Sequence, residues 1–266
     1  MIELKELRVA YGEKEVLKGV TTVFAQGAFT CVIGPNGGGK STLLRAMAGL
    51  AAYRGTVRVD GADLQELSRR GRAQRLAYLP QTRPVPDIDA RTLIAHGRFP
   101  HLGFSKTLTA RDRELVEQAA VRTGCAAFLD RKLGELSGGE RQRVYLAMVV
   151  AQDARTILLD EPCTYLDIRH QLELLELLQS LHASGRSVIM VAHDLPQAFA
   201  CATELKVLDG GALAAEGTPE SLFGHPAVPR AFGVAVARDE RPDSLYHCRL
   251  AAPPEGPGPG AGESLR

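Results

Sequence analysis

The sequence has no excess of charge of either sign. Its 266 residues include 32 Lys and Arg against 31 Asp and Glu, which gives a formal net charge of +1. A nucleic-acid-binding protein normally carries clustered positive charge, so the balance argues against nucleic acid as a partner. The hydrophobic and charged fractions, 45% and 24%, are those of an ordinary globular protein.

The cysteines form neither a disulfide framework nor a zinc site. Five are scattered along the chain without a C-x-x-C pair, so reduced and mostly buried thiols are expected. Long apolar runs are also lacking, because none approaches the roughly 20 residues that span a bilayer. The first seven residues alternate apolar and charged side chains, unlike a signal or transit peptide. If the protein serves a membrane, we expect it to do so from the cytosol through a partner.

Short runs rich in Val, Ile and Leu alternate with longer helical patterns, which predicts an α/β layered fold. The continuous apolar runs 156–160 and 187–192 favour central strands of a mostly parallel sheet covered on both faces. Residues 205–216 predict a hairpin that turns at Gly210-Gly211. Further strands are predicted at 29–33, 56–60 and 75–79.

Between residues 81 and 154 the pattern is helical only. One helix is predicted to begin after Thr109, a typical N-cap residue, and to end at Gly124. We therefore predict a helical subdomain, 82–154, inserted into an α/β core made of 1–81 and 155–235. A C-terminal extension, 236–251, follows. The Pro- and Gly-rich tail, 252–266, is predicted to be disordered.

One segment fits the pattern G-x-x-x-x-G-K-[ST] between a predicted strand and a helix predicted over 40–50. Glycines let backbone N–H groups converge on phosphate oxygens, and the helix N-terminus adds partial positive charge. Lys40 would reach the β- and γ-phosphates, and the Ser41 hydroxyl would ligate Mg²⁺. A merely flexible glycine loop is the alternative. The predicted phosphate-binding residues are Gly34, Pro35, Asn36, Gly37, Gly38, Gly39, Lys40, Ser41 and Thr42.

The apolar run 156–160 ends in two carboxylates, Asp160 and Glu161. Buried carboxylates need partners, and Mg²⁺ is the natural one here. We predict that Asp160 holds the metal and that Glu161 acts as general base for the attacking water. Such a run before Asp-Glu is common by itself, and it gains weight because it follows the phosphate loop.

Residues 136–140, Leu-Ser-Gly-Gly-Glu, followed by Arg-Gln-Arg, resemble the signature motif of ABC ATPases. The helix expected over 141–151 can turn its N-terminus toward a γ-phosphate, although an ordinary helix cap is the alternative. The resemblance covers roughly residues 1–235 and implies a P-loop NTPase core, an N-terminal antiparallel β part and an inserted helical subdomain. It also implies a head-to-tail homodimer that binds two ATP molecules. In it, the motif of one subunit completes the site of the other through Ser137, Gly138, Gly139 and Glu140.

Four further positions match the family. Tyr11 resembles the aromatic residue that stacks on adenine, and Gln81 the glutamine that ligates Mg²⁺ and links the core to the helical subdomain. His193 resembles the switch histidine at the γ-phosphate, and Asp167 the aspartate that communicates across the dimer. The implied catalytic residues are Glu161, His193 and Gln81, and the implied metal ligands are Ser41, Gln81 and Asp160. Two departures are minor: Glu140 stands where many members have Gln, and Cys163 where relatives often have Thr.

A transport ATPase is the predicted function, peripheral on the cytoplasmic face of the inner membrane. Its expected partners are integral membrane permease subunits and, through them, a substrate-binding protein. Soluble ABC proteins of DNA repair or translation are disfavoured, because neither a long coiled-coil insertion nor a second nucleotide unit is present. A GTPase or kinase is disfavoured because the chain lacks an Asn-Lys-x-Asp motif.

The transported molecule is harder to predict, because it contacts the membrane partners. Segments 161–171 and 97–101 resemble importers of ferric siderophores, haem and cobalamin. We predict ferric siderophore import and leave haem and cobalamin open. The membrane subunit would dock on the helical subdomain, and five side chains near that route are expected to be exposed: Arg83, Arg91, Arg98, Phe99 and His101.

Overall fold

A computed structural model of the chain describes residues 1–103, 107–164, 166–238 and 246–250. The predicted tail, 252–266, and part of the predicted extension, 236–251, lie outside these residues. Among the described residues no helix is long and apolar enough to cross a membrane.

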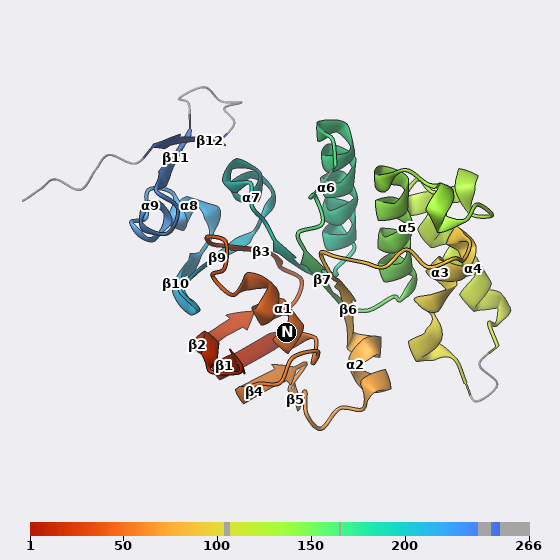
Figure 1. Cartoon of the computed structure of the whole chain (residues 1–266), viewed down its shortest axis with the longest axis horizontal. Helices are drawn as coiled ribbons and strands as arrows, with labels where there is room; N and C mark the ends of the chain where they lie inside the picture. Colours follow the sequence, from red (N-terminus) through yellow and green to blue (C-terminus); the bar gives the residue numbers. More distant parts are fainter. Residues whose placement is uncertain (104–106, 165, 239–245, 251–266) are drawn as a thin grey trace, which may run out of the picture.

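The centre of the molecule is a six-stranded sheet (Figure 1). Five neighbouring strands run parallel, and β10 pairs antiparallel at one edge. The three central strands are buried along their whole length because helices cover both faces of the sheet. In spatial order the strands are β10 (Ala212–Gly217), β9 (Glu204–Asp209), β3 (Phe29–Ile33), β8 (Ser187–Val191), β7 (Thr156–Asp160) and β6 (Leu76–Leu79).

A second, four-stranded antiparallel sheet lies beside the first (Figure 1). Its spatial order is β2 (Lys14–Phe24), β1 (Ile2–Tyr11), β4 (Arg54–Val59) and β5 (Ala62–Asp63). The inward side chains of these strands form one core with α1 (Lys40–Met47) and one face of the central sheet. The predicted α/β fold, with a mostly parallel sheet and an N-terminal antiparallel part, is confirmed.

Most predicted elements are present with small shifts at their ends. The strands at 29–33 and 156–160 have the predicted bounds, and β9 and β10 form the predicted hairpin. The helix predicted over 40–50 ends three residues earlier, at Met47. Helix α4 (Ala110–Arg122) begins with a capping box, in which Thr109 and Asp112 bond to each other's backbone N–H.

The described part of residues 82–154 contains helices and one isolated bridge between Asp89 and Lys132. These helices lie together at one end of the molecule, beyond β6 (Figure 1). The domain boundaries stay a prediction. The helices are α3 (Ala90–His96), α4, α5 (Gly138–Ala151) and the short turns η1 (Phe99–His101), η2 (Ala126–Phe128) and η3 (Leu133–Glu135).

The remaining elements surround the central sheet. Helix α6 (Ile168–Ala183) follows β7, and α7 (Leu195–Cys201) follows β8. The other elements are α2 (Arg69–Arg75), α8 (Pro219–Leu222), α9 (Ala227–Phe232) and a two-stranded hairpin of β11 (Val234–Arg238) and β12 (Tyr246–Leu250).

The expected exposure of the docking residues is wrong for Arg98. Only 6% of this residue is exposed, because its Nε donates to Asp112 at 2.9 Å and its Nη1 to the carbonyl of Ala151 at 2.7 Å. Arg98 therefore joins α4 and α5 from inside the helical region. Phe99, by contrast, is 56% exposed. Arg83, Arg91 and His101 are partly buried.

Candidate active site

The phosphate loop connects the end of β3 to the start of α1, and two of its glycines are required by the chain itself. A Cβ at Gly34 would lie 2.0 Å from the carbonyl oxygen of Leu208. At Gly39 it would lie 2.8 Å from a methyl group of Leu17, at a left-handed φ of +98°. The loop thus packs against β9 and β2, and α1 begins directly after it with backbone N–H groups that have no partner inside the helix.

Lys40 lies inside this loop. Only 5% of the residue is exposed, and its Nζ donates to the carbonyl oxygens of Gly34 and Pro35 at 2.8 and 2.9 Å. Burial lowers the pKa of the ammonium group, while the charges of Glu161 and Asp160 raise it. A buried cation beside free N–H groups is a suitable environment for a phosphate. The depression over the loop, about 430 Å³, is lined by Asn36, Gly37, Gly39, Lys40, Ser41 and Thr42 and also by Lys14, Glu15, Val16, Lys18, Glu161 and Gly210.

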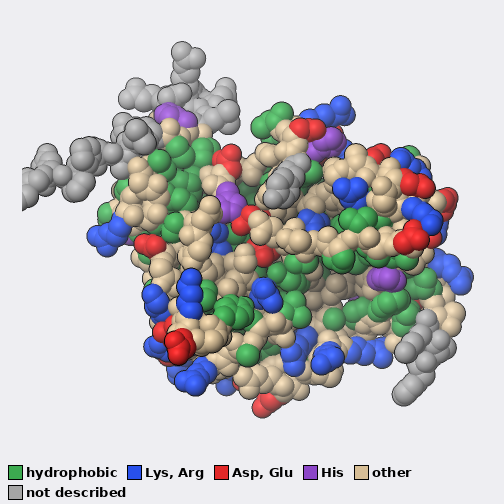
Figure 2. All heavy atoms as spheres, viewed as in Figure 1, with side chains coloured by type: hydrophobic (Ala, Val, Ile, Leu, Met, Phe, Trp, Pro, Cys, Tyr) green, Lys and Arg blue, Asp and Glu red, His purple; other side chains and the backbone are tan. Residues whose placement is uncertain are grey.

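The surface charge over this face of the molecule is mixed. Basic and acidic side chains both lie on the face shown in Figure 2, as expected for a chain of net charge +1. Attraction to a nucleotide therefore depends on local groups such as Lys40, and the loop itself supplies them.

Asp160 ends β7 beside the first turn of α1. It is 4% exposed and accepts hydrogen bonds from Ser41 Oγ at 2.8 Å and from Tyr78 Oη at 3.3 Å. Burial raises the pKa of this carboxyl, and the bond from Ser41 opposes that shift. A carboxylate and a hydroxyl in contact are hard oxygen ligands of the kind that Mg²⁺ prefers. The residues present therefore fit this cation.

Glu161 follows in a left-handed conformation, with φ +51°. Its side chain is 11% exposed, and Oε1 lies 2.5 Å from Nε2 of His193. Its other oxygen accepts a short hydrogen bond from Nε2 of Gln81. The three predicted catalytic residues thus meet, because Gln81, Glu161 and His193 follow the carboxyl ends of the parallel strands β6, β7 and β8.

The structure corrects the start of the signature helix. Helix α5 begins at Gly138 rather than Arg141, with Ser137 as N-cap residue. Ser137 N–H donates to Glu140 at 2.7 Å, and Glu140 N–H donates to Ser137 Oγ at 3.3 Å, which forms a capping box. Among the described contacts, residues 137–140 bond within their own helix and to Arg131, and Gly139 lies near the ring of His170. None of these contacts is to the phosphate loop.

For two further predicted residues, Asp167 and Tyr11, no hydrogen bond to the phosphate loop is found among the described residues. Asp167 caps α6 by accepting from the N–H of His170 at 3.0 Å. Tyr11 ends β1 and is 48% exposed, so its ring is available to a planar ligand. Tyr165 of the same family segment lies outside the described residues.

Three contributors were missed from the sequence. Tyr78 donates to Asp160, Thr164 Oγ1 lies 3.4 Å from Glu161, and Gln142 donates to the carbonyl of Pro162 at 2.6 Å. Tyr78 could have been found, because it lies near the end of the strand that precedes Gln81 and neighbouring parallel strands end at one edge. No local pattern points to the pairing of Gln142 with Pro162.

Comparison with known proteins identifies the family. Residues 17–164, more than half of the chain, match the family model described as ABC transporter. The chain belongs to the ABC transporter ATP-binding family. It is 39% identical over 233 residues to the ferric enterobactin transport ATP-binding protein FepC of Escherichia coli, with 86% of each chain covered. Members of this family are ATPases that bind ATP, so the chain is an ATP hydrolase.

Other ABC transporter proteins are similar to this chain in sequence or in fold. The iron(3+)-hydroxamate import ATP-binding protein FhuC of Bacillus subtilis is 38% identical over 82% of each chain. The cobalamin import ATP-binding protein BtuD of Halobacterium salinarum is 39% identical over 89% of this chain and 60% of its own. Among solved structures, the dimeric ABC transporter cassette MJ0796 bound to ADP and Pi has a TM-score of 0.75 at 25% identity and covers 82% of this chain and 99% of its own. An inward-facing metal-chelate type ABC transporter shares the fold, with a TM-score of 0.80 at 22% identity over 94% of this chain and 97% of its own.

Proposed function

We propose that the chain is the ATP-hydrolysing subunit of a membrane import system for a metal chelate, specifically a ferric siderophore. The contact of Glu161 with both His193 and Gln81, beside the phosphate loop, carries the hydrolytic part of the proposal. The substrate rests on relatives named for ferric enterobactin, iron(3+)-hydroxamate, petrobactin and achromobactin. The subunit works at the cytoplasmic face of the membrane with permease subunits and an external substrate-binding protein.

The residues at and around the loop divide the binding of the nucleotide among them. The loop 34–42 and Lys40 hold the phosphates, and Tyr11 stacks on the base. Ser41 and Asp160 would hold Mg²⁺, and Gln81 would be a further ligand through its amide oxygen, because its amide nitrogen is bonded to Glu161. The cation, when bound, neutralises charge on the transferred phosphoryl group.

Glu161 is the general base. Its carboxylate takes a proton from a water molecule that attacks the γ-phosphate. His193 Nε2 lies against the same carboxylate and fixes its orientation. In this arrangement His193 acts both on Glu161 and on the phosphate that Glu161 faces.

The signature motif serves a second copy of the chain. A Cβ at Gly138 would meet no atom within 4 Å, and one at Gly139 would meet the ring of His170 only at ordinary contact distance, 3.6 Å or more. Neither glycine has a left-handed φ, so nothing within one chain requires a residue without a side chain there. We propose that a phosphate of the nucleotide held by the opposite subunit occupies that space at the N-terminus of α5.

The first test separates chemistry from binding. Glu161→Gln keeps the shape of the site and removes only the base, so MgATP binding persists while hydrolysis falls by about 100-fold or more. Lys40→Ala instead weakens nucleotide binding itself. Both are measured with labelled ATP and a phosphate-release assay. Turnover of Glu161→Gln near that of the wild type would remove Glu161 from the role of base.

The second test mixes two inactive chains. Gly138→Asp places a negative charge where the phosphate of the partner would bind, and Lys40→Ala disables the loop. A heterodimer of the two retains one intact site and occludes ATP, whereas neither parent does. No occlusion in a mixture of folded parents would indicate a site built within one chain.

Cobalamin import is the second candidate, because BtuD of Halobacterium salinarum has the same 39% identity to this chain as FepC, although the match covers 60% of BtuD and 86% of FepC. A clean deletion strain decides between them. Loss of growth on a ferric siderophore as sole iron source, with growth on free iron intact, supports the first. Full siderophore-dependent growth combined with failure to use cobalamin supports the second.

A further inference from the structure

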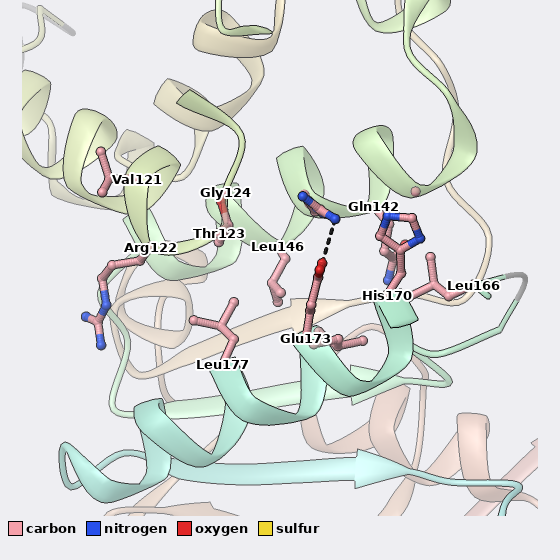
Figure 3. Close-up of a pocket in the computed structure, with 13 residues that line it drawn as sticks. Val121, Arg122, Thr123, Gly124, Gln142, Leu146, Leu166, His170, Glu173 and Leu177 are labelled. Atoms are coloured by element: carbon pink, nitrogen blue, oxygen red, sulfur yellow. Dashed lines mark hydrogen bonds and ion pairs between the residues drawn. The ribbon is translucent and has the colours of Figure 1, made fainter. Parts of the chain in front are cut away.

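Helices α5 and α6 face each other across a pocket of about 360 Å³ (Figure 3). Because the pocket separates the two helices here, they are joined across it by individual side chains. The ion pair between Arg143 Nη2 and Glu173 Oε2, 2.6 Å long, is one such bridge and is drawn as the dashed line in Figure 3. The lining comes from α5 (Gly139, Gln142, Arg143, Leu146), from α6 and its approach (Leu166, His170, Glu173, Leu174, Leu177) and from residues 121–124.

His170 lies in the first turn of α6 and lines the pocket opposite Gly139, in the first turn of α5. Its Nδ1 lies 2.8 Å from Oδ2 of Asp167, whose other oxygen accepts from the backbone N–H of His170. A carboxylate can only accept, so Nδ1 carries the proton. The imidazole ring is thereby fixed relative to Asp167, and hydrogen bonds to His170 lower the pKa of that carboxyl.

The ring also faces the signature motif, with the same Nδ1 nearest to it. The three atoms nearest to a Cβ built on Gly139 all belong to the His170 ring, at 3.6 to 3.8 Å. A displacement of the first turn of α5 toward α6 that closes this space brings the backbone of Gly139 against the ring. Gln142, one turn further along α5, donates to the carbonyl of Pro162 and holds the segment between β7 and α6 to the same helix.

From these contacts we infer that His170 is a positioning residue that couples the signature motif to Asp167 within one chain. The inference rests on the proposed function, in which the signature motif faces the second subunit, and on the role across the dimer that the family resemblance implies for Asp167. When ATP pulls the signature motif of one subunit toward the loop of the other, the ring transfers that displacement to Asp167. Both groups then reach the interface in one fixed geometry, and hydrolysis at the paired site depends on that geometry.

Two substitutions separate the two contacts of the His170 ring, one with Gly139 and one with Asp167. His170→Phe keeps a ring against Gly139 and removes the donor to Asp167. His170→Asn keeps a donor at the position of Nδ1 and removes most of the ring. Arg169→Gln is the matched control, because the side chain of Arg169 lies on the same turn, is 83% exposed and pairs with Glu173. Only the backbone of Arg169, which the substitution keeps, bonds to Asp167.

The measurement is steady-state hydrolysis of MgATP by the full chain, with kcat and KM determined separately and urea unfolding followed in parallel. A misplacement of about 1 Å costs on the order of 100-fold in rate, so each His170 variant is expected to lower kcat by about 10- to 100-fold. KM for ATP and the unfolding midpoint stay near wild type, as does every parameter of Arg169→Gln. A residue that only supports the fold would instead lower the midpoint and raise KM together with the loss of rate.

A double variant tests whether His170 acts through Asp167. If it does, Asp167→Asn combined with His170→Phe lowers kcat no further than the more severe single variant, whereas independent effects multiply. Multiplying effects, or kcat within twofold of wild type in both single variants, would overturn the inference while leaving the proposed function intact. Wild-type protein that hydrolyses no ATP would overturn the proposed function instead.

Discussion

Replacement of Arg98 by Met should destabilise the protein without touching the nucleotide site. The side chains of Arg98 and Asp112 are 7% and 9% exposed, so the ion pair between them is buried. Met fills similar space but leaves the Asp112 carboxylate without its cation and the carbonyl of Ala151 without its donor. Breaking a buried pair from one side costs about 3–5 kcal/mol.

The remaining contacts of Asp112 place the expected cost at the lower end of that range. Its Oδ2 still accepts from the hydroxyl of Thr109 at 2.6 Å and from the Thr109 N–H at 3.0 Å. We therefore expect a loss of about 3 kcal/mol in the free energy of unfolding. With a slope of about 3 kcal/mol per molar urea, the midpoint falls by about 1 M.

Urea unfolding followed by circular dichroism measures this shift, with Arg91→Met as the control. Arg91 also pairs with two carboxylates, those of Glu117 and Asp130, but its side chain is 43% exposed. Each exposed pair contributes only about 0.2–1 kcal/mol, so loss of both pairs in Arg91→Met should move the midpoint by no more than about 0.7 M. Equal shifts in the two variants would refute the argument that burial decides the energy.

Three further outcomes are expected. Gly34→Ala should reduce both stability and nucleotide binding, because the new Cβ meets the carbonyl oxygen of Leu208. Gly138→Ala should leave the urea midpoint within about 0.3 M of wild type. Equal midpoints for the two variants would contradict this reasoning. The pKa of Asp112 is lowered from 3.8 to about 2, chiefly by the Thr109 hydroxyl, so its contribution is complete above pH 3.8 and is lost as the pH falls toward 2. Acid unfolding of wild type and Asp112→Asn should therefore converge in that window, and a constant gap between them would count against it. Phe99→Ala should leave MgATP hydrolysis by the isolated chain unchanged, and it should weaken the binding free energy to the permease by about 2 kcal/mol, because Phe99 is 56% exposed. Co-purification with the permease measures this, and unaltered assembly would exclude Phe99 from the docking surface.

The contiguous motifs could be predicted because their physics is local. A buried strand, a glycine turn and a helix start within the span 29–47 fix the phosphate loop, whatever the rest of the chain does. The capping box at Thr109 is local in the same sense. Helix α5 was predicted three residues too late, because the glycines at 138 and 139 favoured a loop, whereas the capping bonds between Ser137 and Glu140 include both in the first turn.

The burial of Arg98 could not be predicted because its partners are distant in sequence. Asp112 lies 14 residues away and Ala151 lies 53 residues away. A charged residue between Gly97 and Phe99 has the local pattern of an exposed turn, and only the packing of α4 and α5 around it supplies the neutralising groups. The same reasoning applies to Gln142 and Pro162, whose contact depends on how α5 lies against the segment after β7.

The sequence by itself determined the phosphate loop, the carboxylates that end β7 and the family, because each depends on residues that are neighbours along the chain. Only the tertiary structure decided that Gln81, Glu161 and His193 touch, since that contact requires β6, β7 and β8 to lie side by side and parallel. It also decided that Gly138 opens onto free space while Gly34 is enclosed by Leu208. Both are glycines in glycine-rich motifs, and what surrounds each of them is set by chain segments far away in the sequence.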